Sequence, residues 1–187
     1  MRSLRYCINI SLDGCVDHRV GLADEETHKF HARSLERADA LLYGRITYSM
    51  MQEGWRSVAE SGLASPGMPQ WVVPFAQTID AARKYVVTNT LPQVDWNAQI
   101  IRGGELERAV RELKAQPGKE LLTGGVTLPL ALAELDLIDL YEFVVYPRIA
   151  GRGPTLLAGL SKFLDLKLVD QERISVGSVV LRYEPVR

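Results

Sequence analysis

Cysteine is scarce in this sequence, since Cys7 and Cys15 are the two cysteines among its 187 residues. Two thiols cannot build a disulfide framework or a cysteine-rich metal cage, so both are expected to be reduced. Long apolar runs are also missing, and none approaches the roughly 20 residues that a membrane-spanning helix needs. The sequence therefore excludes disulfide scaffolds, cysteine-rich zinc modules and membrane-spanning helices.

An excess of charge of either sign is missing as well. The chain has 22 basic and 23 acidic side chains, which gives a net charge of -1. Without a block rich in lysine or arginine, it lacks the electrostatic surface typical of proteins that bind nucleic acids or membrane surfaces. No long apolar segment precedes Asp13, so we expect no signal peptide. The expected location is the cytoplasm, with neither nucleic acid nor membrane as a partner.

Hydrophobic residues make up 47% of the chain, and their pattern predicts one α/β domain over residues 1–187. Leu4, Tyr6, Ile8 and Ile10 alternate with more polar residues, as in a half-buried strand. Short apolar runs predict further buried strands at 40–43, 85–87, 100–101 and 120–123. The last third has no helical periodicity and predicts an antiparallel end to the sheet, with strands at 140–146, 164–172 and 176–184.

Helices are predicted between these strands. Asp24 can cap the first helix, which runs to about Ala38. Further helices are predicted over 45–52, from 105 onward and over 127–135. Residues 54–80 contain many glycines and prolines, which predict an irregular stretch with one short helix at 71–76. The expected fold is α/β, with a mixed, mostly parallel sheet, flanking helices and an antiparallel C-terminal hairpin.

Two of the junctions between a strand and a helix carry glycine. One contains Gly44, Arg45 and Thr47, and the other runs from Gly124 to Thr127. Glycine allows the backbone to approach a ligand closely, and the helix N-terminus that follows offers free N–H groups and a positive dipole. The Arg45 guanidinium can also bind a phosphate through two hydrogen bonds. Each junction alone is typical of a tight turn, but the pair also suits the phosphates of a nucleotide.

The familiar catalytic fingerprints are absent from the sequence. Gly151-Arg152-Gly153 lacks the third glycine and the following helix of a dinucleotide-binding turn. Neither a P-loop nor a Gly-x-Ser-x-Gly elbow of a serine hydrolase occurs. Glu25, His28 and His31 fall three residues apart, so they share one helical stripe and could bind a metal. We interpret this stripe as a solvated helix face, because no second cluster of ligands is present.

Several motifs in register nevertheless resemble the dihydrofolate reductase-like superfamily. The resemblance is strongest to the branch that contains the C-terminal reductase domain of the riboflavin-pathway enzyme RibD. It extends from residue 4 to residue 184. The motifs are Ser11-Leu12-Asp13-Gly14, Gly44-Arg45-x-Thr47-Tyr48, Tyr85 to Leu91, Gly124-Gly125-x-Thr127-Leu128, Asp136-Leu137-Ile138-Asp139 and Pro147-x-x-x-Gly151-x-Gly153.

The resemblance implies a sheet of about eight strands that binds NADPH along the carboxyl edges of its central strands. It places Gly44, Arg45 and Thr47 at the cofactor's phosphates, and Thr88 with Asn89 near the adenosine end. A glycine pair joined by a cis peptide bond and followed by a helix N-terminus would hold the pyrophosphate. That segment is Gly124, Gly125, Val126, Thr127 and Leu128.

The same resemblance implies a lid and a substrate side. The loop from Ser11 to Val20 corresponds to a mobile lid over the nicotinamide, to whose carboxamide Asn9 and Val16 would offer backbone groups. A carboxylate on the first helix would assist protonation, with Asp24 as first candidate and Glu25 as second. Asp13 and Tyr146 are candidates to face the substrate.

The resemblance predicts a stand-alone NADPH-dependent reductase that acts on a C=N or C=O bond of a small pterin, pyrimidine or related molecule. No tryptophan precedes Trp55, which disfavours dihydrofolate, and no zinc-deaminase motif is present. The candidate activities therefore resemble 5-amino-6-(5-phosphoribosylamino)uracil reductase or dihydrofolate reductase. A homodimer is expected to pair through the apolar strand at 143–145 and the closing hairpin. Two alternatives remain, a dinucleotide-binding protein without catalysis and a structural module without cofactor.

Overall fold

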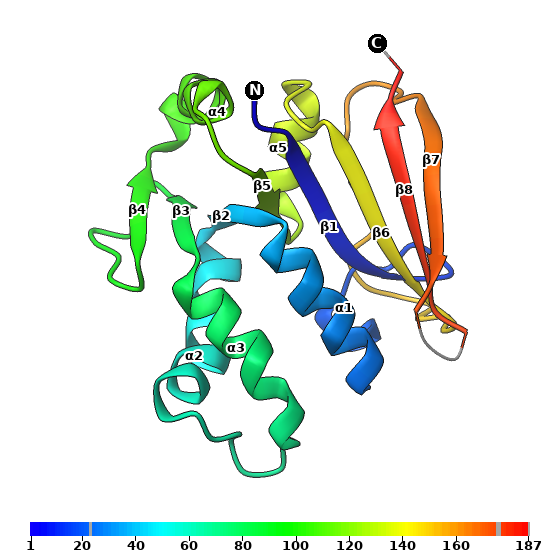
Figure 1. Cartoon of the computed structure of the whole chain (residues 1–187). Helices are drawn as coiled ribbons and strands as arrows, with labels where there is room; N and C mark the ends of the chain where they lie inside the picture. Colours follow the sequence, from blue (N-terminus) through cyan, green and yellow to red (C-terminus); the bar gives the residue numbers. More distant parts are fainter. Residues whose placement is uncertain (23, 175–176, 187) are drawn as a thin grey trace.

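The computed structural model describes residues 1–22, 24–174 and 177–186. Its strands form one 8-stranded sheet in the order β4-β3-β2-β5-β1-β6-β8-β7 (Figure 1). The strands are β1 (Leu4–Ser11), β2 (Ala38–Gly44), β3 (Arg83–Val87), β4 (Ala98–Ile101), β5 (Glu120–Thr123), β6 (Leu140–Tyr146), β7 (Leu166–Arg173) and β8 (Val179–Pro185).

The sheet is mixed and mostly parallel, which confirms the predicted fold class. The strands from β4 to β6 in the sheet order pair in parallel, whereas β8 runs antiparallel to β6, and β7 runs antiparallel to β8. The predicted start of the last strand at Val176 lies outside the described residues. Strand β6 is hydrogen-bonded to β1 on one edge and β8 on the other, so the run at 143–145 is interior and cannot pair two subunits edge to edge.

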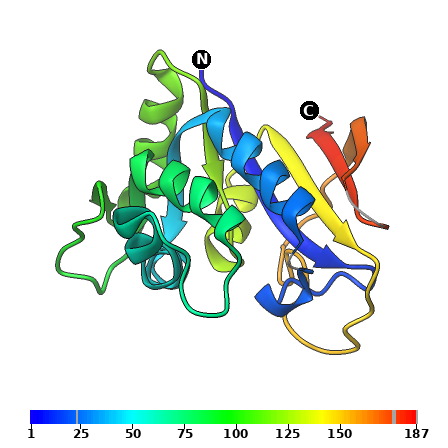
Figure 2. The ribbon, with the colours of Figure 1, turned by 60° about the horizontal axis from the view of Figure 1, so that its bottom comes forward.

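Helices cover both faces of the sheet, as Figures 1 and 2 show. They are α1 (Glu25–Glu36), α2 (Arg45–Ser61), α3 (Val73–Ala81), α4 (Leu106–Ala115) and α5 (Thr127–Glu134). Side chains of α4 and α5 share a core with Leu4 and Tyr6 of β1. Side chains of α1, α2 and α3 pack with Leu41 and Tyr43 of β2 on the other face. This alternation along each strand produces three layers.

A buried cluster of charged residues attaches α1 to the sheet. Arg5 of β1 pairs with Glu142 of β6 and donates from Nη1 to Ser34 Oγ of α1 at 2.5 Å. Arg182 of β8 donates from Nε to Glu142 Oε2 at 2.6 Å. Burial by itself would raise the pKa of Glu142, but the two arginines lower it below its ordinary value. The carboxylate therefore stays ionised, and α1 is held over the face of β1 that carries Arg5, Cys7 and Asn9.

The prediction of an irregular stretch over 54–80 is wrong at both ends. Helix α2 continues through Gly54 to Ser61, and α3 extends to Ala81 rather than ending at 76. A glycine inside a helix costs about 1 kcal/mol relative to alanine. Continuing the helix places Trp55 against Phe75, with 4.9 Å between ring centroids, and buries Val58. Apolar burial outweighs the local preference, and the helix ends at Gly62, whose φ is +66°.

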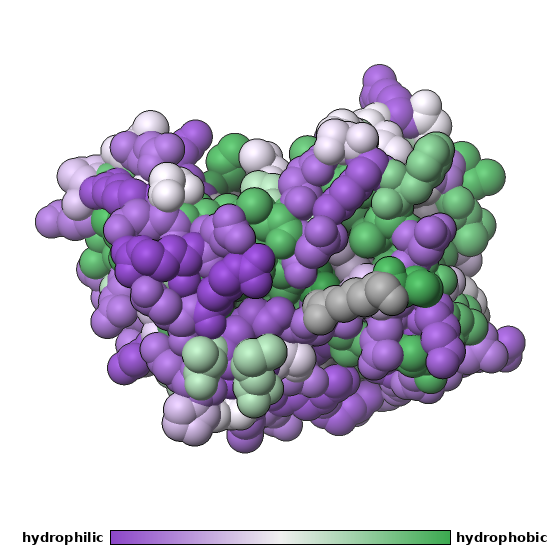
Figure 3. Space-filling model, turned by 90° about the horizontal axis from the view of Figure 1, so that it is seen from above, coloured by the Kyte–Doolittle hydropathy of each residue, from purple (hydrophilic) through white to green (hydrophobic). Residues whose placement is uncertain are grey.

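The two ends of the sheet differ in character. The end seen from above in Figure 3 carries both chain termini and α4, and it is largely hydrophilic on the side of α4. The salt bridges Arg108–Glu112 and Arg111–Glu107 lie on that helix. Within the described residues, no helix combines the length and hydrophobicity needed to cross a membrane.

Candidate active site

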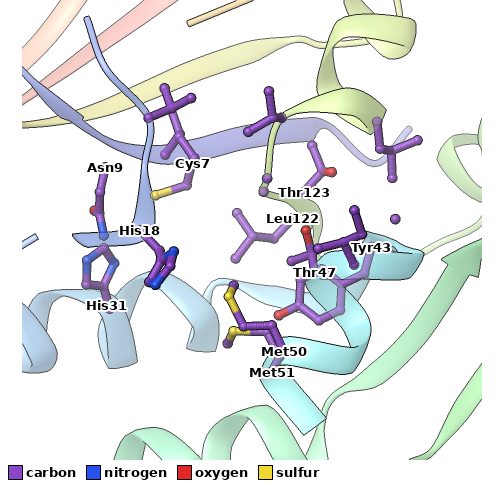
Figure 4. A pocket seen from close by; sticks show the side chains of 18 of the residues that line it. Cys7, Asn9, His18, His31, Tyr43, Thr47, Met50, Met51, Leu122 and Thr123 are labelled. Carbon is purple, nitrogen blue, oxygen red and sulfur yellow. The ribbon is translucent and has the colours of Figure 1, made fainter. Parts of the chain in front are cut away.

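A cavity of about 970 Å³ lies at the carboxyl ends of the central strands. Its floor is formed by Asn9 of β1, Tyr43 of β2 and Thr123 of β5, and residues of α1, α2, α3 and α5 complete its wall. Figure 4 shows two ends of this space. Asn9, His18 and His31 gather at one end, whereas Tyr43, Thr47 and Thr123 lie at the other. Carboxyl edges of parallel strands are the usual position of ligand sites in α/β folds.

The fold brings the two glycine junctions into contact. Gly44 precedes α2 and Val126 precedes α5, and in the described structure neither residue caps its helix with a side-chain hydrogen bond. A Cβ on Gly125 would collide with Thr47 Oγ1. Both helix N-termini therefore open onto the cavity side by side with free N–H groups. Gly44, Arg45, Thr47 and the whole segment 124–128 line the cavity.

The prediction of a cis peptide bond between Gly124 and Gly125 is wrong, because none of the described peptide bonds is cis. The chain turns instead through a φ of +91° at Gly125, a conformation that residues with a Cβ rarely adopt. The hydroxyl of Tyr6 donates to the Gly125 carbonyl at 3.1 Å and thereby fixes the turn to β1. Glycine is thus required here for its positive φ and for its contact with Thr47.

The interpretation of the stripe as a solvated face is wrong for its two histidines, although Glu25 is exposed and pairs with Lys29. His28 and His31 line the cavity and are only partly exposed, because α1 lies over β1 with these two residues turned inward. The Nδ1 atom of His28 lies 3.0 Å from the carbonyl oxygen of Asp24, so Nδ1 must carry the proton. The metal alternative gains no support, because no group of three His, Cys, Asp or Glu able to hold an ion occurs in the described part of the chain.

Two buried polar atoms in the cavity wall are unsatisfied. Asn9 Oδ1 and His31 Nε2 have no hydrogen-bond partner among the described residues. Burial lowers the pKa of His31 to about 4, with a further contribution from His28, so the imidazole is neutral near pH 7. Burial also raises the pKa of Tyr146 to about 12 and raises that of the Cys7 thiol. The groups named here are therefore uncharged near pH 7, whereas the carboxylate of Asp17, also in the wall, is paired with Arg19.

Five predicted site residues lie outside the described cavity wall, and one of them, Glu25, pairs with Lys29 on the exposed side of α1. Asp24 caps α1 and accepts from Thr27 N at 2.9 Å and Thr27 Oγ1 at 2.7 Å. Asp13 accepts from the backbone amides of residues 150 and 151. Thr88 Oγ1 accepts from the amides of residues 90 and 91, and Asn89 Oδ1 accepts from Gly103 N at 2.8 Å. Gly103 lines the cavity, so Asn89 is bonded to a residue of the wall without belonging to it. The predicted roles of all five residues stay predictions.

The predicted lid is bonded to a distant segment of the chain. Val16, which lines the cavity, donates from its amide to Pro154 O at 2.8 Å, and Leu12 N donates to Arg148 O at 2.8 Å. The Cys15 thiol donates to Arg152 O at 3.3 Å. We therefore expect residues 11–20 and 148–156 to behave as one unit.

Sequence reasoning missed much of the apolar wall. Met51 and Trp55 follow Thr47 at steps of four along α2, and all three line the cavity. Cys7 precedes Asn9 by two residues on the same face of β1. The helical and strand periods could have identified these positions once Thr47 and Asn9 were chosen. Phe75 of α3 could not have been found this way, because only the tertiary fold brings it to the site.

Comparison with known proteins agrees with this geometry. A model of the RibD C-terminal domain family matches residues 2–180. The uncharacterized protein YyaP of Bacillus subtilis (strain 168) is 26% identical over 178 residues, which cover 93% of this chain and 90% of that protein.

Two solved structures share the fold. The deaminase/5-amino-6-(5-phosphoribosylamino)uracil reductase from Thermotoga maritima matches with a TM-score of 0.66 and 18% identity, covering 99% of this chain and 57% of that one. Dihydrofolate reductase from Enterococcus faecalis, complexed with NADP(H), matches with a TM-score of 0.59 and 12% identity, covering 98% and 96%.

Proposed function

The chain belongs to the RibD C-terminal domain family, and we propose that it is an NADPH-dependent reductase of a small C=N or C=O substrate. The observation that carries this proposal is the meeting of two uncapped helix N-termini beside Arg45 at the rim of the cavity. Two such helix ends and a guanidinium supply convergent N–H donors and positive charge, which the phosphates of a dinucleotide require.

The residues present fit this cofactor. A Cβ on Gly125 would collide with Thr47 Oγ1, so the bare glycine backbone allows the N-terminus of α5 to lie directly against that of α2. Arg45 is exposed at the first position of α2, and Thr47 and Thr127 add hydroxyl donors to the same rim. Bound NADPH would supply a hydride to the substrate. The backbone near Asn9 and Val16 would orient the nicotinamide end.

The reacting heteroatom of the substrate must gain a proton when its carbon is reduced. Asp24 reaches the cavity through Thr27, whose hydroxyl donates to Asp24 Oδ2 at 2.7 Å and which itself lines the wall. Tyr146 lies in the same part of the wall. We infer that Thr27 is the group through which Asp24 acts, and that Val16 and the apolar side chains exclude water from the reacting centre.

The proposal is tested by titrating the purified protein with NADPH and with NADH. Trp55 lines the cavity, so its fluorescence should report binding, and a sub-millimolar dissociation constant for NADPH is expected. Arg45→Gln removes one charge-assisted contact, which is worth about 1.5–3 kcal/mol, and should weaken NADPH binding by about 10- to 100-fold. Its melting temperature should not change, because Arg45 is exposed. Failure to bind either nucleotide would overturn the reductase proposal.

A dinucleotide-binding protein without catalysis is the second candidate. The observation that favours it is the position of Asp24, whose carboxylate is engaged as the cap of α1. This candidate predicts binding of NADPH without oxidation at 340 nm in the presence of pterins, pyrimidinones or aldehydes. Turnover of any of these compounds would exclude it.

A further inference from the structure

We propose that the end of the cavity around Asn9 and His31 binds a planar, uncharged molecule that carries no phosphate, through hydrogen bonds to Asn9 Oδ1 and His31 Nε2. This inference rests on the proposed function, because it assigns the other end of the cavity to the dinucleotide. It concerns the substrate class, which the family membership leaves open.

The two unsatisfied atoms are the first reason. A buried donor or acceptor without a partner destabilises the fold, so such atoms are rare unless something pairs with them. Asn9 Oδ1 and His31 Nε2 both belong to residues that line the same cavity. They point to a ligand with a polar edge, in which an N–H group meets Asn9 Oδ1 and a donor or acceptor meets the neutral imidazole.

The fold places these two residues at the same end of the cavity. Arg5, Cys7 and Asn9 lie on one face of β1, and Arg5 is bonded to Ser34 of α1. His31 lies one helical turn before Ser34, and Figure 4 shows it beside Asn9 and apart from Thr47 and Thr123. A single small molecule can therefore contact both side chains.

The apolar wall near this end favours a flat molecule. The ring of His28 lies edge-on to Trp71 and Phe75, with centroid distances of 4.6 and 5.8 Å. Trp55 and Phe75 form another edge-on pair, and both rings line the cavity. Met50 and Met51 lie between the two ends of the cavity in Figure 4. Aromatic rings and thioethers of this kind pack well against a heterocyclic ring.

The charges of the wall argue against a phosphate on this molecule. Among the lining residues that the structure describes, Arg45 is the one arginine or lysine, and it lies at the rim assigned to the dinucleotide. Arg19 is adjacent to the lining residue His18, but its guanidinium already donates to both carboxylate oxygens of Asp17. Among the described lining residues, a phosphate at the Asn9 end would therefore meet the carboxylate of Asp17 and no free arginine or lysine.

The third helix N-terminus near the cavity is also closed to anions. Asp24 occupies the cap of α1, and Glu25 and Glu26 lie in its first turn. Three carboxylates at this position repel a phosphate instead of binding it. The Thermotoga maritima protein is named for reduction of a phosphoribosyl compound. The charges of the cavity wall in this chain predict instead a substrate without a phosphate group.

The test uses two pairs of probes that differ only in a phosphate. One pair is 5-amino-6-ribosylaminouracil and its 5′-phosphate, and the other is pyridoxine and pyridoxine 5′-phosphate. Binding is measured by calorimetry to the whole protein, without cofactor and saturated with NADP⁺, so that no turnover occurs. We expect the unphosphorylated member of at least one pair to bind at least about 10-fold more tightly. Equal or tighter binding of both phosphates, or no binding of either unphosphorylated probe, would overturn the proposal.

Variants of the two polar residues provide the second arm. His31→Phe and Asn9→Leu keep approximate shape but remove the hydrogen bonds, and each should weaken the preferred probe by about 10-fold. In His31→Phe, NADPH affinity should stay within about 2-fold of the parent value. His31→Gln replaces the first variant if it fails to fold. Lys29→Gln, an exposed position on α1, is the control and should bind as the parent does. Unchanged probe affinity in the Asn9 and His31 variants would refute the assignment.

The proposed function and this inference fail in different ways. Absence of NADPH binding by the parent protein would refute the proposed reductase. The preference for the unphosphorylated member of each probe pair, measured without cofactor, would still decide this inference.

Discussion

At the scale of single residues, Gly125 carries two separate constraints. Its φ of +91° disfavours any side chain, and its position against Thr47 leaves no room for a Cβ. The sequence predicted a glycine turn for phosphate binding, but not the contact between residues 47 and 125. That contact requires β5 to lie beside β2 in the sheet.

We expect Gly125→Ala to lower the free energy of unfolding by about 1–3 kcal/mol, through backbone strain and the collision with Thr47. NADPH affinity should fall as well, because the N-terminus of α5 moves. Thr47→Ala should recover part of the lost stability in the double variant, as urea unfolding of the four proteins would measure. If the two substitutions change the free energy of unfolding additively, the collision does not contribute to the destabilisation.

His31 makes stability depend on pH. Its pKa is about 4 in the folded protein, below the value of about 6.5 in an unfolded chain. The unfolded chain therefore binds more protons between these two pH values. The stability that neutral His31 contributes is fully present above pH 6.5 and is lost as the pH falls toward 4. The loss should approach about 3 kcal/mol, at about 1.4 kcal/mol per pKa unit.

Urea unfolding at pH 7 and pH 4.5 would measure this loss. His31→Gln cannot titrate and should show a smaller decrease over the same interval. An identical decrease in parent and variant would mean that another group is responsible.

At the scale of elements, the loop from Ser11 to Val20 is joined to the segment after β6 through Asp13. Ala150 N and Gly151 N donate to its two carboxylate oxygens at 3.0 and 2.7 Å. A hydrogen bond from Ser11 and these backbone amides lower the pKa of Asp13 to about 2. The link therefore persists at any pH at which the protein is assayed.

Asp13→Ala should release both amides, and their hydrogen exchange should accelerate by about 10-fold or more, since local opening becomes easier. Asp17→Asn, in the same loop, should leave exchange at residues 150 and 151 unchanged. Continued protection in Asp13→Ala would show that the remaining backbone bonds hold the two segments together by themselves.

Helix α2 shows where local patterns stop being informative. Gly54 and the prolines beyond it indicated that the helix ends near residue 54. The helix continues because α3 provides apolar partners for Trp55 and Val58. The prediction that the histidines of α1 face solvent was wrong for the same reason. The period of the stripe was correctly predicted, but whether it faced water or the cavity depended on the packing of α1 against β1.

At the scale of the whole molecule, β7 ends the described sheet order and leaves an open edge. Leu168 and Val169 on this strand are 45% and 43% exposed. Open edges with apolar residues favour association, so the predicted homodimer is expected to form here rather than through 143–145. Light scattering should give twice the chain mass, and Val169→Lys should shift the protein toward the single chain. A parent protein with the mass of one chain would contradict this expectation.

Strand alternation, helical period and turn residues are local properties, so the sequence predicted most elements and both glycine junctions, but not the extent of α2 and α3. The order of its motifs also carried the family resemblance. Which of these features meet depends on the tertiary structure. Thr47 and Gly125 become neighbours through the strand order, and Asn9 and His31 through the packing of α1 on β1. No short segment of the sequence specifies either arrangement. The polar end of the cavity around Asn9 and His31 could therefore be recognised only in the folded molecule.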